Sequence, residues 1–257
     1  MGNLFSFTDT NNTNTLNKDD IIFPTKKTEV IVSNTKLKTI EIKYKITIDL
    51  EIKFKNSFNK NLDKNYIELF EKYHGIIFGF SFNHMINEKI PTNIIFLHFG
   101  HNFNQPINNM IYYNSDIDSN TDSKMKEIIF GSHFNQSVDN LPPNIKKITF
   151  GDNFNCEVKN LPSSIEFIKF GYMFNKSVEY LPCGLIYIEF GNNFNHKICD
   201  LPTTIEEIKL GSNFEQEITL IPHKLKKIIL FSNYYNLNKN HLEKNIFASK
   251  LIDVVIQ

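Results

Sequence analysis

A unit of twenty residues repeats along the middle of this chain. The shared pattern is L-P-x-x-I-x-x-I-x-F-G-x-x-F-N-x-x-V-x-x, and less regular copies precede it around Gly100, Gly79 and Phe54. A short fixed period over many copies is typical of a solenoid, in which each unit packs on its neighbours. The regular copies are marked by a glycine and by a phenylalanine three residues after it: Gly131 and Phe134, Gly151 and Phe154, Gly171 and Phe174, Gly191 and Phe194, Gly211 and Phe214.

Each unit also contains the pattern of one short strand. Ile145, Ile148 and Phe150 have the i, i+3, i+5 spacing of a leucine-rich-repeat strand, whose last two apolar residues point inward. Gly151 permits a tight turn, and the Leu-Pro pair starts the return limb in an extended conformation. Twenty residues leave little room for a helix on that limb. The sequence therefore predicts a mainly β fold, a leucine-rich-repeat-like solenoid of ~20-residue coils with one parallel sheet, capped at both ends.

An asparagine follows the core phenylalanine in most copies. Asparagine side chains stacked in register can bond backbone groups of their own and of the neighbouring coil, which satisfies turn amides that would otherwise be buried without partners. We interpret this column as a structural ladder, and the alternative is an asparagine-lined binding surface. The ladder residues are Asn104, Asn135, Asn155, Asn175 and Asn195.

With Leu-Pro, Gly and Phe-Asn recurring in phase, the chain resembles the FNIP-repeat family, a leucine-rich-repeat-like group of amoebae and giant viruses. The best local match is FNQPI at residues 103–107, and the resemblance covers roughly residues 73–231. It implies a solenoid used for protein contact, with no established chemistry. Some relatives place an F-box before the repeats to recruit a ubiquitin ligase, but residues 1–60 show no helical F-box pattern.

The segment before the repeats predicts a tail and a cap. Residues 1–20 are rich in Asn, Thr and Asp and predict a flexible tail. We expect residues 21–72 to form an N-terminal β/α cap. Apolar residues occupy the even positions from Ile40 to Phe54, which is the pattern of a half-buried strand. Further apolar residues from Leu62 to Tyr73 share one helical face, and Gly75 is expected to end that helix.

The repeats and the segment after them complete the expected domain organisation of the chain. We expect residues 73–231 to form the FNIP-type solenoid, with extra residues that predict a loop insertion at about 108–122. Residues 232–257 are expected to form a C-terminal cap, because Leu242, Ile246 and Phe247 suggest a short helix before a strand-like end.

The chain begins MGNLFS, which matches the N-myristoylation pattern M-G-x-x-x-[ST]. Gly2 is the expected acceptor after removal of Met1, and Ser6 is the recognition residue. One myristoyl chain gives reversible membrane binding, and neither a cysteine nor a lysine cluster lies nearby as a second signal. An unmodified N-terminus is the alternative. We therefore expect a cytoplasmic protein with possible reversible, peripheral membrane association.

Large apolar side chains at outward strand positions are candidates for partner contact. Alternating charges on neighbouring strands are expected beside them, as a ladder of Lys169, Glu189 and Lys209. The rival explanation is that a tail or cap covers this face of the sheet. The candidate contact residues are Phe96, Phe167, Ile186 and Tyr187.

The expected insertion holds one weak metal pattern, with the spacing of a calcium loop. Thr121 stands where the sharp turn of such a loop requires glycine, and the last ligand falls on a predicted strand. We therefore favour a solvated acidic loop and no metal. The residues of the calcium alternative are Asp116, Asp118, Asn120, Asp122 and Glu127.

Charge and side-chain spacing argue against nucleic-acid binding and catalysis. Lysine and arginine together number 28, as do aspartate and glutamate, so the net charge is zero and no basic stripe is expected. His98 and His101 lie on either side of a glycine turn, and we find no Ser-His-Asp or Cys-His arrangement and no phosphate loop. We expect no catalytic residues, no cofactor and no small-molecule substrate.

The function predicted from these features is a non-enzymatic protein-interaction scaffold, with an unidentified protein partner. The alternative is a substrate-recognition adaptor for a ubiquitin ligase without a recognisable F-box.

Overall fold

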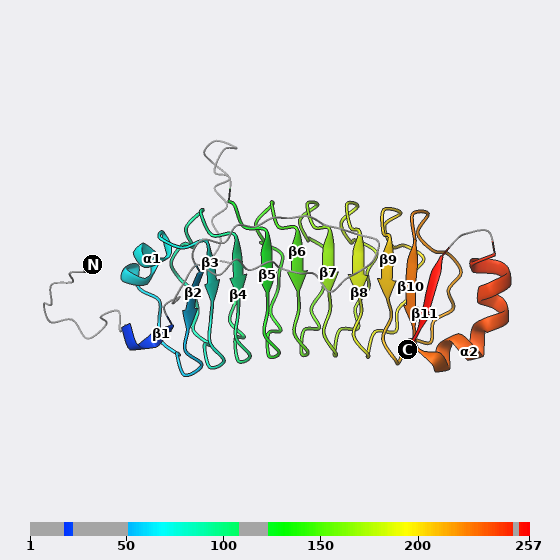
Figure 1. Ribbon diagram of the computed structural model, residues 1–257, viewed down its shortest axis with the longest axis horizontal. Helices are drawn as coiled ribbons and strands as arrows, with labels where there is room; N and C mark the ends of the chain where they lie inside the picture. Colours follow the sequence, from blue (N-terminus) through cyan, green and yellow to red (C-terminus); the bar gives the residue numbers. More distant parts are fainter. Residues whose placement is uncertain (1–17, 23–50, 108–122, 249–251) are drawn as a thin grey trace, which may run out of the picture.

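The computed structural model of the protein describes residues 18–22, 51–107, 123–248 and 252–257. These residues form an elongated solenoid whose strands line one side of the molecule (Figure 1). The strands make one eleven-stranded sheet in sequence order from β1 (Ile21–Ile22) to β11 (Asp253–Ile256), and among the described strands only β1 and β2 (Glu51–Phe54) pair antiparallel. The mainly β, leucine-rich-repeat-like solenoid with one parallel sheet is therefore confirmed.

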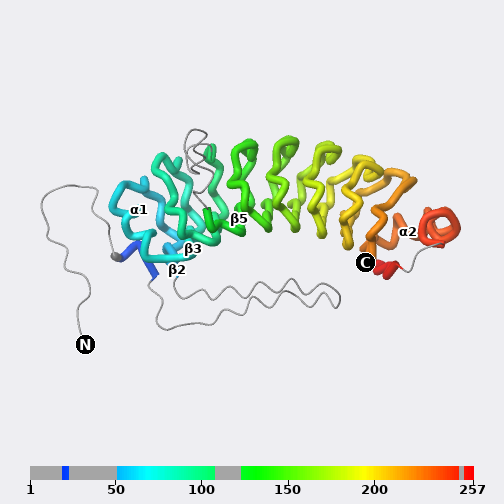
Figure 2. Tube along the Cα trace, turned by 90° about the horizontal axis from the view of Figure 1, so that it is seen from above, coloured from blue at the N-terminus to red at the C-terminus, as the bar shows by residue number. Residues whose placement is uncertain are grey.

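The strands of the coils are short and occupy equivalent positions. Lys147 pairs with Phe167 and Phe167 pairs with Tyr187, so equivalent side chains of successive coils lie side by side. Figure 2 shows the coils stacked along the long axis of the molecule. The strands are β2 (Glu51–Phe54), β3 (Gly75–Ile77), β4 (Phe96–His98), β5 (Glu127–Ile129), β6 (Lys147–Thr149), β7 (Phe167–Lys169), β8 (Tyr187–Glu189), β9 (Glu207–Lys209) and β10 (Lys227–Leu230).

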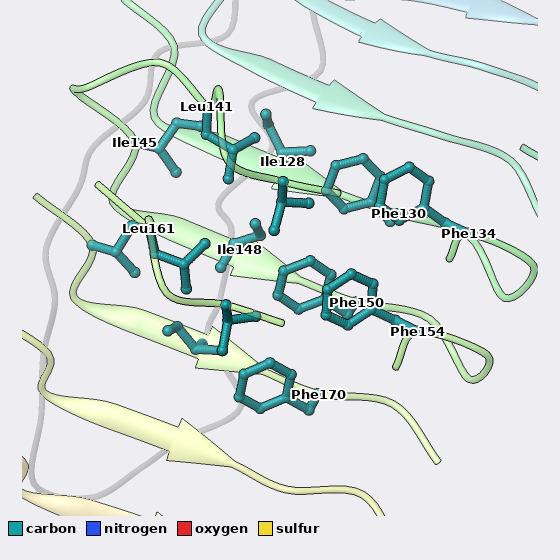
Figure 3. Packing of buried hydrophobic residues seen from close by; sticks show 14 of the residues in the cluster. Ile128, Phe130, Phe134, Leu141, Ile145, Ile148, Phe150, Phe154, Leu161 and Phe170 are labelled. Carbon is teal, nitrogen blue, oxygen red and sulfur yellow. The ribbon is translucent and has the colours of Figure 1, made fainter. Parts of the chain in front are cut away.

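Two columns of phenyl rings run through the core of the solenoid, beside buried isoleucine, leucine and valine side chains. One ring of a coil comes from the residue before the glycine and the other from the third residue after it, except that Leu210 takes the place of the first ring in the coil of Gly211. Phe150 and Phe154 of one coil have ring centroids 3.9 Å apart, and the Phe150 centroid lies 5.4 Å from that of Phe170 in the next coil, with nearly parallel planes (Figure 3). In the second column the centroids of Phe154 and Phe174 are 6.0 Å apart. These distances fit offset stacking, which adds to the free energy gained by burying the rings.

The glycine of each coil lies against the glycine of the coil before it. A Cβ on Gly151 would lie 2.1 Å from the carbonyl oxygen of Gly131, and one on Gly171 would lie 2.0 Å from that of Gly151. The carbonyl oxygen of Gly151 also closes the turn of its own coil, because it accepts a hydrogen bond from the N–H of Phe154 at 3.3 Å. The repeated glycine is therefore required by close backbone approach between coils.

The N-terminal cap consists of a 3₁₀ turn (η1, Lys18–Asp20), β1 (Ile21–Ile22) and helix α1 (Lys64–Phe70). Asp63 caps the helix, since its side chain accepts hydrogen bonds from the backbone N–H groups of Asn65 and Tyr66. The helix buries Phe70, whose ring meets that of Phe54 edge-on at 6.1 Å. Residues 40–50 of the predicted alternating strand lie outside the described residues, and β2 is the part that is described.

The expectation that Gly75 stops this helix is wrong. The helix ends at Phe70, with Glu71 as its C-cap, and Gly75 is the first residue of β3. The absence of a side chain at Gly75 serves another contact, since a Cβ there would lie within 1.9 Å of the Phe96 ring.

The C-terminal cap contains helix α2 (Ser232–His241), a π-helical turn (η2, Leu242–Ile246) and β11 (Asp253–Ile256), which extends the sheet beside β10. The helix therefore begins earlier than the short helix predicted around Leu242. Tyr234 packs edge-on against Phe214 at 5.2 Å and donates its hydroxyl hydrogen to the carbonyl of Gln216 at 2.7 Å. This residue closes the end of the phenylalanine columns.

Candidate functional site

The first candidate surface is the side of the strands that points away from the phenylalanine columns. We call it the outer sheet face. Because side chains alternate along a strand, the middle residue of each strand points inward and its two neighbours point outward. Ile148, Ile168 and Ile188 are such inward residues and have no exposed surface. From β4 to β10 the outer sheet face is formed by Phe96, His98, Glu127, Ile129, Lys147, Thr149, Phe167, Lys169, Tyr187, Glu189, Glu207, Lys209, Lys227 and Ile229.

The four predicted contact residues are not all exposed on this face. Phe96 is 4% exposed and Tyr187 is 8% exposed, so little of either side chain is open to solvent, and their contact with a partner stays a prediction. Phe167 and Ile186 are partly buried. The rings of Phe167 and Tyr187 stack on one another, with centroids 4.4 Å apart and planes 2° apart. Burial of Phe96 follows in part from its position over Gly75 of the neighbouring strand.

Charged side chains form the expected ladder beside the stacked rings. Glu189 Oε1 lies 3.2 Å from Lys169 Nζ and 3.1 Å from Lys209 Nζ. Burial raises the pKa of the Glu189 carboxyl, but the two lysines outweigh burial and leave this pKa below its ordinary value. The Tyr187 hydroxyl donates to Glu189 Oε2 at 3.0 Å, and burial, followed by the charge of Glu189, raises the pKa of Tyr187. These pairs stabilise the stacking of the strands.

Two polar groups on the outer sheet face are buried without hydrogen-bond partners among the described residues: His98 Nε2 and Glu207 Oε2. Glu207 is 1% exposed, and its other oxygen lies 3.1 Å from Lys227 Nζ. His98 Nε2 lies 3.9 Å from Glu127 Oε1, beyond hydrogen-bond distance. Burial lowers the pKa of His98, although Glu127 acts in the opposite direction.

The asparagine column follows a second line along the solenoid. The side-chain oxygen of each asparagine accepts a hydrogen bond from the backbone N–H at the same position of the next coil, as in the 2.9 Å bond from Asn175 to Asn155. The bonds begin at Asn59 and Asn83, before the predicted ladder, and end where Glu215 donates its N–H to Asn195. The remaining hydrogen bonds of the column have N···O distances of 2.9 to 3.0 Å and link, in order, Asn104, Asn135, Asn155, Asn175 and Asn195.

The second candidate surface is the Gly-turn edge, formed by the two residues after the glycine of each coil. Tyr172 is 48% exposed and Met173 is 43% exposed, side by side in one turn. The amide nitrogen of Asn193 lies 3.4 Å from the Met173 sulfur. Met173 also borders a shallow polar hollow, which is lined by Asn155, Asn175, Asn193, Asn195, Asn213 and Glu215.

Sequence reasoning missed Tyr172 and Met173, although the repeat contains a signal for them. The equivalent residues of the two neighbouring coils are polar: Asp152 and Asn153 before, and Asn192 and Asn193 after. A large apolar pair at positions that the two neighbouring coils keep polar is not required by the repeat. A comparison of coils, position by position, would have marked it.

The other predicted sites gain no support from the described residues. Gly2, Ser6, Asp116, Asp118, Asn120 and Asp122 lie outside them, and Glu127 is paired with Lys147 at 3.1 Å. No group of three or more His, Cys, Asp or Glu side chains in the described ranges could hold a metal ion. The three cysteines are free thiols. In the part of the chain that the structure describes, no helix has the length and apolar character to span a bilayer.

Comparison with known proteins agrees with the repeat. The sequence pattern of the FNIP Repeat family matches residues 134–173 and 194–233. A solved structure, described as the crystal structure of CroV588, a novel circular LRR protein, shares 30% sequence identity over 72% of this chain, with a TM-score of 0.41. The chain spans 37% of the length of that protein. No curated protein matches. Residues 134–173 and 194–233 are therefore FNIP repeats, with phased Leu-Pro, Gly and Phe-Asn residues, and they lie in the stacked coils of a leucine-rich-repeat-like solenoid.

Proposed function

We propose that the protein is a non-enzymatic scaffold that binds a protein partner through its Gly-turn edge. The observation that carries this proposal is the exposed pair Tyr172 and Met173 on a rigid coil. The backbone of this turn is bonded on both sides, since Met173 donates to the carbonyl of Asp152 at 2.8 Å and Asn193 donates to that of Tyr172 at 3.0 Å. A surface fixed in this way loses little conformational entropy when a partner binds.

The chemistry around the pair suits a protein partner. Tyrosine and methionine are enriched at protein interfaces, where they fill pockets of the partner. Asparagine amides beside them, from Asn193 and Asn213, offer both donors and acceptors to a partner backbone. The partner that fits has an apolar pocket rimmed by polar groups.

The test is purification of the whole protein from its native cells with its bound partners, compared between variants. Tyr172→Ala/Met173→Ala should reduce partner recovery by about tenfold or more, since loss of a hot-spot side chain weakens binding by over 1.4 kcal/mol. Tyr180→Ala is the matched control, because Tyr180 is 61% exposed on another part of the coil. Equal recovery with all three proteins would contradict the proposal. Recovery of ubiquitin-ligase subunits would support the adaptor function instead of a simple scaffold.

Reversible membrane attachment through a myristoyl group on Gly2 is a second proposal, supported by the MGNLFS sequence. A single chain of this kind binds membranes weakly, so attachment would strengthen when several copies gather on one partner. Mass spectrometry of the mature N-terminus tests it directly. An intact Met1 or a free Gly2 amine excludes the modification, while a myristoyl adduct that Gly2→Ala removes supports it.

A further inference from the structure

The polar hollow beside Met173 lies between two rows of side chains. Each row takes one residue from a coil, either the second or the fourth after the glycine, and the phenylalanine between them is buried in the core. The hollow has a volume of about 420 Å³, which lies within the range of small-ligand sites. Asn155, Asn175, Asn195 and Glu215 form one wall, and Met173, Asn193 and Asn213 form the other.

The asparagines of the first wall have their side-chain oxygens occupied. Asn155 Oδ1 accepts a hydrogen bond from the N–H of Asn175 at 2.9 Å, and Asn175 Oδ1 accepts one from the N–H of Asn195 at 3.0 Å. Asn195 Oδ1 accepts one from the N–H of Glu215 in the same way. Only the oxygen of an amide can accept such a bond, so these bonds fix which way each amide is turned. The NH₂ group of each asparagine is left for another acceptor.

These NH₂ groups find no acceptor among the described residues. The hydrogen bonds that Asn155, Asn175 and Asn195 form within the described ranges use only their backbone atoms and side-chain oxygens. Neighbouring coils lie ~4.8 Å apart, so the hollow presents a row of donors at about that spacing. Because the ladder already holds the amides in place, they lose little conformational entropy when a ligand binds.

The remaining residues of the hollow add an apolar contact and an acceptor. Asn213 donates to Asn193 Oδ1 at 3.3 Å, and Asn193 donates to the Met173 sulfur at 3.4 Å, which holds the second wall in position. Met173 presents an exposed apolar side chain. Glu215 is exposed at the end of the first wall, where its carboxylate accepts hydrogen bonds and repels anions. A ligand that suits this hollow is therefore uncharged, carries both acceptors and donors, and has an apolar side.

A chain of pyranose rings has these properties. Its hydroxyl oxygens accept hydrogen bonds from amides, its hydroxyl hydrogens donate to a carboxylate, and the C–H side of each ring packs on apolar side chains. In an extended β-linked chain, one ring with its linking oxygen is about as long as the distance between coils. An extended peptide rises ~3.3 Å per residue, so its groups on one side recur at about 6.6 Å and fall out of phase with the row of donors.

We propose that the polar hollow binds a neutral polysaccharide, as an extended β-linked chain that lies along the axis of the solenoid. The three free amides donate to its oxygens, Glu215 accepts from its hydroxyl groups, and Met173 packs against one of its rings. The asparagine column then has two roles, because its oxygens join the coils and its nitrogens bind the ligand. The proposal goes beyond the protein partner at the Gly-turn edge and does not rest on it, although the two sites share Met173.

Isothermal titration of the purified full chain with soluble hexasaccharides tests the site without a protein partner. Cellohexaose and chitohexaose are the neutral, extended probes, and at least one should bind with a Kd below about 1 mM. Maltohexaose is the control for chain shape, because its α-linked glucose chain curves away from a straight row, and it should bind at least about tenfold more weakly. The proposal is overturned if neither β-linked probe binds, or if maltohexaose binds as tightly as the better of them.

Variants separate the donors from the ladder. Asn175→Asp keeps an oxygen for the N–H of Asn195 but loses the NH₂ donor, so glycan affinity should fall about tenfold or more while stability in urea titration is largely retained. Asn104→Asp is the matched control, because Asn104 has the same place in the ladder but lies outside the hollow, and affinity should stay within about twofold.

Glu215→Ala gives a second test that leaves the ladder oxygens untouched, and it should also lower glycan affinity by about tenfold. Equal glycan affinities for Asn175→Asp and Asn104→Asp, or an unchanged affinity for Glu215→Ala, would overturn the assignment to this hollow. Either result would leave the protein partner to be tested by its own variants at Tyr172 and Met173.

Discussion

The glycine after each strand touches the backbone of the coil before it, and this residue-scale contact sets the closeness of the coils. In Gly171→Ala the added Cβ would lie 2.0 Å from the carbonyl oxygen of Gly151, so the two coils must move apart. We expect the free energy of unfolding to fall by about 2 kcal/mol or more, as in other overpacked sites. Urea titration followed by circular dichroism measures this change.

The matched control is Gly184→Ala. The nearest atom to a Cβ on Gly184 is the carbonyl oxygen of Ser163 at 3.2 Å, and the equivalent residues of neighbouring coils are Ser164 and Thr204. This glycine lies outside the close contact, and its replacement should change stability by less than about 0.5 kcal/mol. Equal losses for Gly171→Ala and Gly184→Ala would show that the loss reflects glycine flexibility and not contact between coils.

The asparagine ladder gives a second residue-scale prediction. Asn155→Ala removes the acceptor of the Asn175 N–H, and we expect a loss of about 1 kcal/mol in the free energy of unfolding. Asn155→Asp keeps an acceptor oxygen and should retain most of the stability. Asn153→Ala is the control, since Asn153 is exposed and lies in the neighbouring turn. If Asn155→Asp were as unstable as Asn155→Ala in urea titration, the hydrogen bond accepted by the side-chain oxygen would not explain why asparagine recurs at this position.

At the scale of elements, the sequence predicted the strands of the coils far better than the caps. Ile148 and Phe150 alternate on a short strand, and the same spacing recurs in every copy, so the repeats corroborate one another. A cap occurs once and has no such support. Helix α2 is mostly Asn, Lys and Tyr, and of its residues only Tyr234 is buried, so little apolar periodicity marks its start at Ser232.

The surfaces were less predictable than the core for a related reason. Alternation along a strand predicts which side chains point outward, and Phe96 and Tyr187 do point outward. It does not predict how far they are exposed, because exposure depends on packing against other parts of the chain. Tyr172 and Met173 were missed because they interrupt no part of the repeat pattern and leave the core unchanged.

The C-terminal cap carries a pH-dependent prediction. Burial raises the pKa of Tyr234 to about 12, whereas an unfolded tyrosine has a pKa near 10. Between these values the folded chain keeps a proton that the unfolded chain releases, so stability falls as pH rises from about 10 to about 12. Tyr234→Phe should be less stable at neutral pH, from loss of the bond to Gln216, but its stability should fall less steeply in this range. The prediction would be contradicted if urea titrations showed the free energy of unfolding of the two proteins falling equally steeply with pH across this range.

At the scale of the whole molecule, each coil contacts mainly the coils before and after it. The parallel pairs follow sequence order from β2 to β11. Such a solenoid has stability that is close to a sum over coils and their interfaces, so the place of a defect decides how far its effect spreads. The two phenylalanine columns run through these interfaces and couple each coil to the next.

Two equivalent substitutions test this expectation. Phe154 lies in the middle of a column and Phe214 at its C-terminal end, and both are buried, at 0% and 2% exposure. Replacement of either by alanine should lower stability by about 3–5 kcal/mol in the coils that contact it. In hydrogen exchange, Phe154→Ala should weaken amide protection in β5, β6 and β7, while Phe214→Ala should act on β9, β10 and α2 and spare β5. Protection lost evenly along the chain in both variants would mean that the coils unfold as one unit, because coupling between coils would then exceed the stability of any single coil.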